Sequence, residues 1–370
     1  MKVPLSRPYI KKEEITAVLK VLKSGYLSLG PKLLSFEENF AKYIGTKHAV
    51  AVNSGTSGLH LIIKSLGIKK GDEVITTPFS FIASANCILF ENAKVVFADI
   101  DQKTYNMDAT KIEKLITPRT KAILAVHIFG QCCDMTTIMK IAKKHNLLVI
   151  EDACEAIGAT HKGKKAGTFG HAACFAFYPN KQITTGEGGI IVTNDDKVAS
   201  LCKSYRNQGR DTMLWLDHSR IGYNYRINEI SCVMGIEQLK KIGKILKLRE
   251  NVAKKYIKKL KGNKNIILPT ILKGNEESWF VFVIQVKDHI SRDKVMEILK
   301  QKGIGTNTYF PSIHLSTFYR NKFHFKEGAF PVSESTSKRT IALPFFSELS
   351  DREINYVCKT LCEAIELGNK

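Results

Sequence analysis

Short apolar segments alternate with longer amphipathic segments along the first half of the chain. The apolar segments predict seven strands, at His48–Val52, Glu73–Thr76, Val95–Asp99, Ala122–Val126, Leu147–Glu151, Ala173–Phe177 and Ile190–Thr193. The amphipathic segments predict helices at Lys12–Leu22, Leu33–Ile44, Ser57–Ser65, Phe81–Phe90, Ala109–Ile116, Thr136–His145 and Lys197–Arg206. Buried strands joined by helices are typical of a mainly parallel sheet covered on both faces, so we expect an α/β fold. In such sheets ligands bind beyond the carboxyl ends of the strands.

The pattern changes after Gly222, where a helix from about Asn228 leads into a lysine-rich helix and then into a linker-like segment at 263–275. The remaining elements are predicted as strands at Trp279–Val286, 306–310 and Ile341–Leu343, and as helices at Ser291–Lys302, after a Ser333 cap, and at Asp351–Leu367. We therefore predict a large α/β domain at 1–250 and a smaller C-terminal α+β domain at 251–370.

The composition is that of a soluble globular protein, with 44% hydrophobic and 25% charged residues in a chain of 370. No segment resembles a signal peptide, and the longest apolar runs, such as Ile123–Gly130, are too short to span a bilayer. We therefore expect a cytoplasmic protein with no membrane partner. The nine cysteines lack CxxC spacing and the ten histidines are scattered, which predicts free thiols and no metal site.

The formal net charge is +21, and a dense part of it lies between Lys240 and Lys264. This stretch holds ten lysines and Arg249 against one acidic residue, Glu250, and its helical spacing favours a solvated helix face. A basic surface can also attract nucleic acid or an anionic small substrate. Because a single aromatic residue, Tyr256, lies among the lysines and no nucleic-acid-binding motif accompanies them, the sequence disfavours nucleic acid as a partner.

One lysine stands between aromatic and glycine-rich residues, in Phe177-Tyr178-Pro179-Asn180-Lys181 followed by Thr185-Gly186-Glu187-Gly188-Gly189. Exclusion of water from an amine favours its neutral, nucleophilic form, so Lys181 is a candidate for Schiff-base chemistry. A lone lysine at the end of a strand more often reaches into solvent. The choice between these interpretations depends on the residues upstream.

Two upstream segments carry polar groups at strand ends. Asn53-Ser54-Gly55-Thr56-Ser57 opens a helix after a strand, where free amides and the helix dipole can bind an anion, although a simple N-cap explains it equally well. Asp152 ends a buried strand and needs a partner, for which a protonated heteroaromatic nitrogen or a helix N-terminus would serve.

Two further segments offer groups for a planar, anionic ligand. Phe81 begins a helix above a strand end and could stack on a ring, although core packing is more common for phenylalanine. Asn224 and Arg226, in Gly222-Tyr223-Asn224-Tyr225-Arg226, could bind a phosphate and a carboxylate, or simply form a surface turn. A phosphate site, a stacking aromatic, a buried acid and a reactive lysine are together the parts that a pyridoxal-phosphate enzyme requires.

The chain resembles the sugar aminotransferases of the DegT/DnrJ/EryC1/StrS family, pyridoxal-phosphate enzymes of fold type I. The resemblance rests on Pro4-Leu5-Ser6-Arg7-Pro8, Asn53-Ser54-Gly55-Thr56, Glu151-Asp152-Ala153, Tyr178-Pro179-Asn180-Lys181 with Thr185-Gly186-Glu187-Gly188-Gly189, Gly222-Tyr223-Asn224-Tyr225-Arg226, and Pro311 with His314. Motifs in this number and order span nearly the whole chain.

The resemblance implies a role for each residue at the cofactor ring. Lys181 would hold the cofactor aldehyde and shift the proton, and Asp152 would pair with the pyridine nitrogen and keep it protonated. Phe81 would stack on the ring. Glu155 would lie near the phenolic oxygen, where the family often has glutamine.

The resemblance also implies the residues that bind phosphate. The amides of Gly55, Thr56 and Ser57 would bind it, and Asn224 would reach the phosphate of a second subunit, which implies a homodimer with shared active sites. The family usually has serine where this chain has Ala176, and losing one neutral donor to a dianion costs about 1.5–3 kcal/mol if nothing replaces it. We expect the Ser57 hydroxyl or a water molecule to replace that donor.

We predict an enzyme that transfers the amino group of L-glutamate to a keto group, at C4, of a deoxysugar linked to a nucleotide diphosphate. For substrate or donor contacts the candidates are Arg226, His127, Tyr309 and His314, although His127 fits a packed loop histidine better. Alternatives are amination at C3 or of a cyclitol, dehydration, and a regulatory nucleic-acid-binding protein that retains the fold. Dehydrating relatives carry histidine at the lysine position, so Lys181 disfavours dehydration.

Overall fold

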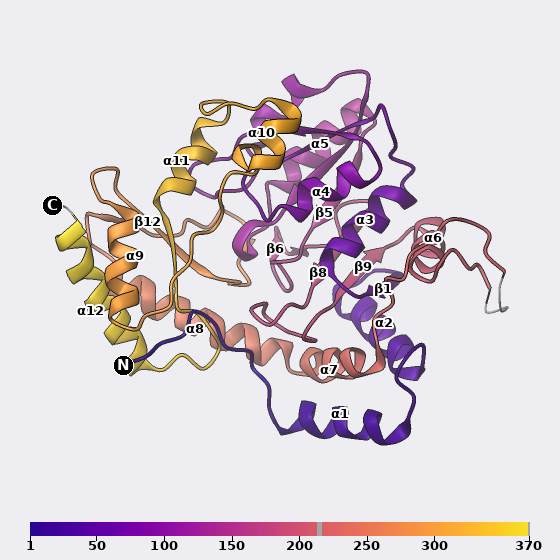
Figure 1. The fold of residues 1–370 in the computed structure, drawn as a ribbon, viewed down its shortest axis with the longest axis horizontal. Helices are drawn as coiled ribbons and strands as arrows, with labels where there is room; N and C mark the ends of the chain where they lie inside the picture. The colour runs from indigo at the N-terminus through magenta and orange to yellow at the C-terminus, as the bar shows by residue number, and fades with distance from the viewer. Residues whose placement is uncertain (213–216, 369–370) are drawn as a thin grey trace.

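A seven-stranded sheet forms the centre of the larger part of the structure, a computed structural model that describes residues 1–212 and 217–368 (Figure 1). Its strands, in spatial order, are β1 (His48–Val52), β9 (Gly189–Thr193), β8 (Ala172–Ala176), β5 (Leu148–Asp152), β4 (Thr120–Val126), β2 (Glu73–Thr76) and β3 (Lys94–Phe97). The pairs from β8 across to β3 are parallel, whereas β9 is antiparallel to both β1 and β8. The predicted α/β fold with a mainly parallel sheet is confirmed.

Helices cover both faces of this sheet because its strands are apolar on both sides. One face carries α3 (Gly55–Ser65), α4 (Ala83–Phe90) and α6 (Asp196–Arg206), and the other carries α2 (Pro31–Ile44), α5 (Met135–His145) and α7 (Glu229–Lys240). Successive residues of one strand point to opposite faces, so Val50 of β1 packs with Leu59 of α3, while Ala51 packs with Phe36 of α2. The sheet is therefore buried on both sides, and its strand ends are the places left for a site.

The C-terminal part has its own small sheet and core. The sheet consists of β10 (Ile266–Ile267), β12 (Phe282–Val286) and β13 (Thr340–Leu343), and the helices around it are α8 (Ile242–Leu260), α9 (Arg292–Gln301) and α12 (Asp351–Gly368). Tyr256, Phe282 and Leu361 are wholly buried in this core. A smaller α+β unit thus follows the large one, as the sequence pattern predicts.

The two parts share contacts on both sides of the predicted boundary at residue 250. Helix α8 crosses that boundary, with Ile245 in the core of the large part and Tyr256 in the core of the small part. The hairpin of β6 (Thr160–His161) and β7 (Lys164–Lys165) is joined by β11 (Asn275–Glu276) from the C-terminal part. In addition, Tyr319 of α10 (Thr317–Phe323) donates a hydrogen bond of 2.9 Å to Asn86 of α4. The division into 1–250 and 251–370 therefore stays a prediction.

Three predicted elements differ from the structure. The segment predicted as a helix at Ala109–Ile116 forms two 3-10 turns, η1 (Ala109–Lys111) and η2 (Glu113–Leu115), after an Asp108 cap. Residues 306–310 make only an isolated bridge to β13. Ser333 lies inside α11 (Pro331–Arg339), which begins at a proline whose fixed φ suits a first helical position.

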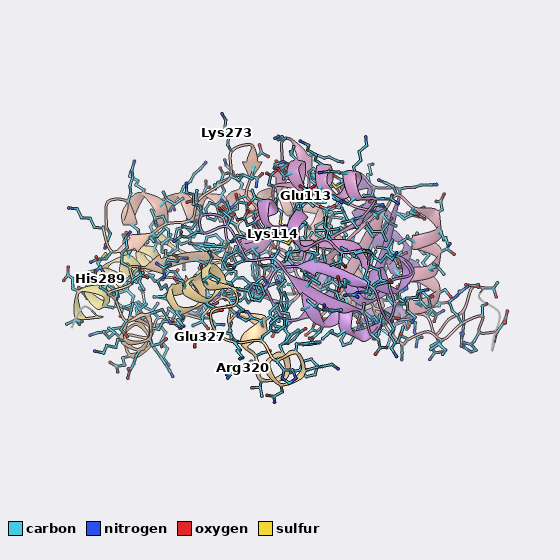
Figure 2. All side chains as sticks on the ribbon, turned by 90° about the horizontal axis from the view of Figure 1, so that it is seen from above. Glu113, Lys114, Lys273, His289, Arg320 and Glu327 are labelled. Atoms are coloured by element: carbon cyan, nitrogen blue, oxygen red, sulfur yellow. The ribbon has the colours of Figure 1, made fainter. Side chains whose placement is uncertain are left out.

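The surface is polar and charged. Charged side chains such as Lys273, Arg320 and Glu327 point outward (Figure 2). The amphipathic helix α1 (Lys12–Ser24) lies along the edge formed by α7 (Figure 1). Within the described part of the chain, no helix has the length and apolar character needed to cross a membrane.

Candidate active site

A cavity of about 740 Å³ opens where the carboxyl ends of the large sheet meet the C-terminal part. The large part contributes Gly55, Thr56, Phe81, Asp152, Glu155 and Lys181 to its lining. The C-terminal part contributes Phe280, Asn307, Tyr309 and Pro311. Six of the residues singled out from the sequence as cofactor ligands thus lie around one space.

Lys181 points its amine into the protein and not into solvent. The chain turns back after β8, with the Lys181 N–H donating to the Tyr178 carbonyl over 2.9 Å. The side chain is 13% exposed, and its Nζ lies 3.3 Å from Glu155 Oε1 and 3.9 Å from the centroid of the Phe280 ring. A carboxylate and the negative face of an aromatic ring both attract an ammonium group, so the two contacts fix the position of this amine.

Asp152 is the last residue of β5 and is 6% exposed. The Ser84 hydroxyl donates to its Oδ2 over 2.7 Å, and the Cys154 N–H donates to its Oδ1 over 3.2 Å. No helix begins directly after Asp152, so the helix-cap interpretation does not apply. Because β5 and β8 are adjacent and parallel, this carboxylate and Lys181 emerge at the same end of the sheet.

The N-terminus of α3 forms another wall of the cavity. Ser54 caps the helix by accepting a hydrogen bond from the Ser57 N–H over 3.1 Å. A Cβ on Gly55 would lie 2.8 Å from the Ala176 Cβ and 2.9 Å from the Cys154 sulfur, so only glycine lets the backbone come this close. Unpaired amides at a helix start are suited to a phosphate group.

Ser57 itself lies outside the lining of the cavity. Its N–H donates to the Ser54 hydroxyl, and its own hydroxyl donates to Asn53 Oδ1 over 2.7 Å. The structure therefore does not place this hydroxyl where the serine missing at Ala176 would act. Ser54 and Thr56 are the hydroxyl-bearing residues near the helix start that line the cavity.

Phe81 is 61% exposed although its neighbours Phe79 and Ala83 are buried. It lies just before α4 and lines the cavity. Core packing, the common fate of phenylalanine, does not account for this residue. An exposed ring at the edge of a cavity is available to stack on a planar ligand.

Glu155 is buried and held at both carboxylate oxygens. Its Oε2 accepts a hydrogen bond of 2.9 Å from the Phe129 N–H, and Oε1 faces Lys181. Burial raises the pKa of Glu155, while the charge of Lys181 and the Phe129 N–H act in the opposite direction. The carboxyl therefore takes up a proton more readily than a glutamate in water.

Of the weaker substrate candidates, only Tyr309 lines the cavity. Its hydroxyl accepts a hydrogen bond of 3.3 Å from Asn180, and burial raises the pKa of Tyr309 to about 12.

His127 is 0% exposed, and its Nε2 lies 3.0 Å from Glu151. His314 is also 0% exposed, with Nε2 3.0 Å from Glu334. The expectation that these two histidines contact a substrate is not supported, because both rings are enclosed by protein.

Asn224 and Arg226 lie outside the lining of the cavity. Asn224 is exposed, and Arg226 donates a hydrogen bond of 3.1 Å to Asn207. Neither residue therefore contributes to the Lys181 cavity of its own chain. The structure leaves Asn224 free to reach a second molecule, as the sequence interpretation requires.

Several lining residues carry no recognisable signal in the sequence. Ser84 lies one turn beyond Phe81, and its spacing alone could have suggested that both face the strand ends. Phe280 lies far along the chain in a segment predicted simply as strand, and only the packing of the two parts brings it to Lys181. Local periodicity in the sequence does not show which residues from distant parts of the chain come into contact.

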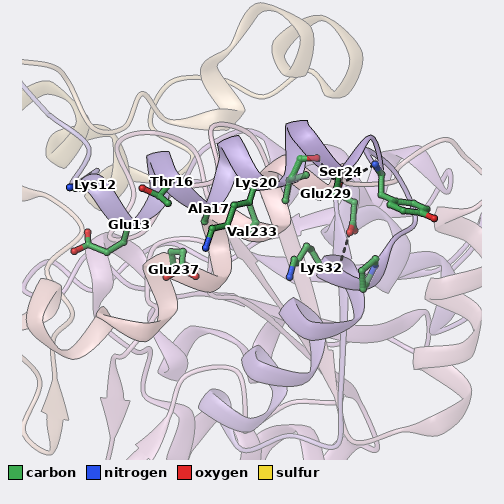
Figure 3. Close-up of a pocket in the computed structure, with 13 residues that line it drawn as sticks. Lys12, Glu13, Thr16, Ala17, Lys20, Ser24, Lys32, Glu229, Val233 and Glu237 are labelled. Carbon is green, nitrogen blue, oxygen red and sulfur yellow. Dashed lines mark hydrogen bonds between the residues drawn. The ribbon is translucent and has the colours of Figure 1, made fainter.

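A second hollow, of about 750 Å³, lies between α1 and α7 (Figure 3). Lys12, Glu13, Lys20 and Glu237 line it with side chains that also meet solvent. The described residues form no group of three or more histidine, cysteine, aspartate or glutamate side chains that could hold a metal ion. The cavity at Lys181 is the better candidate for chemistry, because a largely buried lysine and the buried carboxylates of Asp152 and Glu155 line it.

The residues around Lys181 fit pyridoxal phosphate. The amides at the start of α3, which Gly55 allows to pack closely against Ala176 and Cys154, suit a phosphate, and the exposed ring of Phe81 suits a stacked pyridine. The amine of Lys181 and the carboxylate of Asp152 provide the two polar anchors that the aldehyde and the ring nitrogen need.

Comparison with known proteins agrees with this fit. The model of a family described as the DegT/DnrJ/EryC1/StrS aminotransferase family matches residues 8–362. GDP-perosamine synthase from Caulobacter vibrioides is 38% identical over 369 residues, which cover 98% of each chain.

Solved structures give the same result. The aminotransferase PseC from Helicobacter pylori, involved in the biosynthesis of pseudoaminic acid, superposes with a TM-score of 0.95 and 31% identity, covering 99% of this chain and 100% of that one. The PLP form of the putative sugar aminotransferase Spr1654 from Streptococcus pneumoniae has a TM-score of 0.94 and 27% identity, covering 99% of both chains.

Proposed function

The chain belongs to the DegT/DnrJ/EryC1/StrS aminotransferase family and is a sugar aminotransferase, and from that premise we propose its cofactor, substrates and site. The cofactor is pyridoxal phosphate. The reaction moves the amino group of L-glutamate to the C4 keto group of a deoxysugar linked to a nucleotide diphosphate. The observation that carries this proposal is the joint placement of the Lys181 amine, the Asp152 carboxylate and the start of α3 around one cavity.

Each residue of the cavity has a task in this scheme. When bound, the cofactor supplies an aldehyde that accepts nitrogen and a ring that withdraws electrons. Asp152, fixed by Ser84, would hold the ring nitrogen in its protonated form. Gly55 and Thr56 would bind the phosphate through their amides, and Phe81 would cover one ring face. Lys181 would take a proton from the substrate carbon at Nζ and return it.

The sugar would lie against the side of the cavity formed by the C-terminal part. Asn307 and Tyr309 present an amide and a hydroxyl there, which are suited to the hydroxyl groups of a sugar. Asn180 orients Tyr309 by donating to its hydroxyl. The formal charge of +21 favours the approach of a nucleotide diphosphate.

A homodimer would complete the site. The N-terminal segment exposes apolar side chains, among them Ile15, Leu19 and Tyr26, and Tyr26 lines the hollow between α1 and α7. Apolar side chains that lie close together on a surface are typical of interfaces. Asn224 and Arg226, which do not serve their own cavity, would then reach the partner's phosphate and the carboxylate of the amino donor. Sedimentation should give twice the mass of the chain.

The direct test is an assay of the purified protein with pyridoxal phosphate, L-glutamate and a panel of ketosugars. The panel should contain nucleotide-linked C4-ketosugars, C3-ketosugars and a cyclitol ketone, and the release of 2-oxoglutarate should be measured. We expect turnover with at least one C4-ketosugar and none with Lys181→Ala. Turnover confined to C3-ketosugars or cyclitols would replace the substrate proposed here. A colourless wild type that binds DNA at physiological salt would refute the enzymatic function.

A further inference from the structure

Glu155 lies against the amine on which the proposed reaction depends. Its Oε1 is 3.3 Å from Lys181 Nζ, while Oε2 accepts a hydrogen bond of 2.9 Å from the Phe129 N–H. One oxygen is thus held by the backbone, and the other is left for the lysine. Hydrogen bonds between catalytic groups are often this long before a substrate binds.

The carboxyl of Glu155 takes up a proton more readily than an exposed glutamate. Burial raises its pKa above the ordinary 4.5, and the opposing charge of Lys181 is the largest effect in the other direction. A glutamine, which the resemblance leads one to expect here, could donate a hydrogen bond from its amide but could not exchange a proton. Glutamate at this position can therefore exchange a proton, which glutamine cannot.

The other titratable groups around Glu155 are few. Asp152 acts on it from the end of β5 and raises its pKa. Tyr309 faces it from the C-terminal part, and burial raises the pKa of that phenol to about 12. Cys154 precedes it in the chain, and its thiol has a pKa well above the ordinary value because of Cys174 and burial. Neither the phenol nor the thiol ionises near neutral pH, and among the described side chains Lys181 is the one within hydrogen-bond distance of Glu155 Oε1.

We propose that Glu155 is the proton-exchange partner of Lys181, holding at Oε1 the proton that the lysine takes up and releases during amino transfer. The inference rests on the proposed function. In one direction an N–H bond of the lysine ammonium breaks and an O–H bond forms on Glu155. In the other direction the O–H bond breaks and the N–H bond forms again. Only a proton moves, so no group is oxidised or reduced.

Glu155→Gln is the informative variant, because it keeps the size of the side chain and an oxygen that accepts from the Phe129 N–H. The holoprotein should be mixed with L-glutamate, and the loss of visible absorbance followed in single turnovers from about pH 6 to 9. We expect the rate at the optimum to fall about 100-fold, while the L-glutamate concentration giving half the maximal rate changes less than about threefold. A rate within about threefold of wild type over this range would overturn the proposal.

A pH titration of the visible absorbance of the holoprotein without substrate provides a readout that is independent of activity. We expect a titration step in wild type that is absent or displaced in Glu155→Gln. A purely structural role would lower stability or cofactor occupancy but leave that step in place, and this result would also overturn the proposal. If L-glutamate does not bleach the wild type, the proposed amino donor is wrong, yet the titration still tests Glu155.

If Glu155→Gln binds the cofactor poorly, chemical rescue provides a second test. Formate added to Glu155→Ala supplies a carboxyl of the right size, and we expect it to restore the rate by about tenfold or more. Absence of rescue in a variant that binds the cofactor normally would contradict proton exchange at this position. The matched control is Glu327→Gln, which removes a carboxylate from an exposed pair with Lys338 and should leave rate and titration unchanged.

Discussion

The carboxyl of Glu277 should make the stability of this protein strongly dependent on pH. Its Oε2 is enclosed and has no hydrogen-bond partner among the described residues. Burial raises the pKa of Glu277 to about 8, and no other cause contributes. The substitution Glu277→Gln tests this pH dependence, because it removes the ionisable carboxyl and keeps the shape of the side chain.

The magnitude follows from the two pKa values. Each pKa unit between the folded and the unfolded chain corresponds to about 1.4 kcal/mol. Because the pKa of Glu277 rises from the ordinary 4.5 to about 8, ionisation of this carboxyl destabilises the folded chain by at most about 5 kcal/mol. The folded chain keeps the proton to higher pH than the unfolded chain, so its stability falls as the pH rises between these two values. Between about pH 5 and pH 8 this group lowers the free energy of unfolding by up to about 3 kcal/mol, an upper limit because part of the side chain is exposed.

The assay is reversible unfolding in urea near pH 5 and near pH 8, followed by tryptophan fluorescence. At each pH the unfolding free energy of the variant is compared with that of the wild type. The comparison uses the change in this difference between the two pH values, because the buried amide of glutamine needs hydrogen-bond partners equally at both pH values. We expect this difference to shift in favour of Glu277→Gln by about 1–3 kcal/mol at the higher pH. Glu276→Gln, at the exposed neighbouring residue, should show no such shift. Equal pH dependence in wild type and Glu277→Gln would refute the reasoning.

Two further substitutions test groups around the cavity, and a third tests the buried guanidinium of Arg249 in α8. Ser84→Ala removes the hydrogen bond to the Asp152 carboxylate, and we expect about 10-fold weaker cofactor binding by fluorescence titration, whereas Ser84→Thr should bind normally. Gly55→Ala places a Cβ 2.8 Å from the Ala176 Cβ, so it should lose at least about 10-fold in cofactor affinity while the protein stays folded by circular dichroism. Arg249→Met leaves two buried backbone carbonyls without their donor and should lower the urea midpoint by an amount equivalent to about 2–4 kcal/mol; an unchanged midpoint would contradict the structural role assigned to this guanidinium.

The elements of the large sheet could be predicted from the sequence because their signals are local. A continuous apolar run bounded by polar residues gave both ends of β1 and β2 correctly, since such strands are buried on both faces. The helix predicted from Ala109 failed because the segment has apolar residues at helical spacing but only short 3-10 turns form there. Spacing alone does not distinguish one turn from a continuous helix.

The candidate site was predictable where a motif fixes both residue type and position. Asp152 ends β5 and Lys181 follows β8, and adjacent parallel strands bring such residues together. His127 also follows a strand, β4, but its ring turns inward to Glu151, and only side-chain packing decides that. In the same way, the sequence shows a serine at Ser57 but not that its hydroxyl is already bonded within the helix cap.

The central claim is that the amine at Lys181 is the one that holds pyridoxal phosphate, opposite the carboxylate of Asp152. Borohydride reduction of the protein loaded with the cofactor, followed by peptide mapping with mass spectrometry, tests this most directly. The account predicts one phosphopyridoxyl group per chain, on Lys181. A label spread over surface lysines, with Lys181 unmodified, would contradict it.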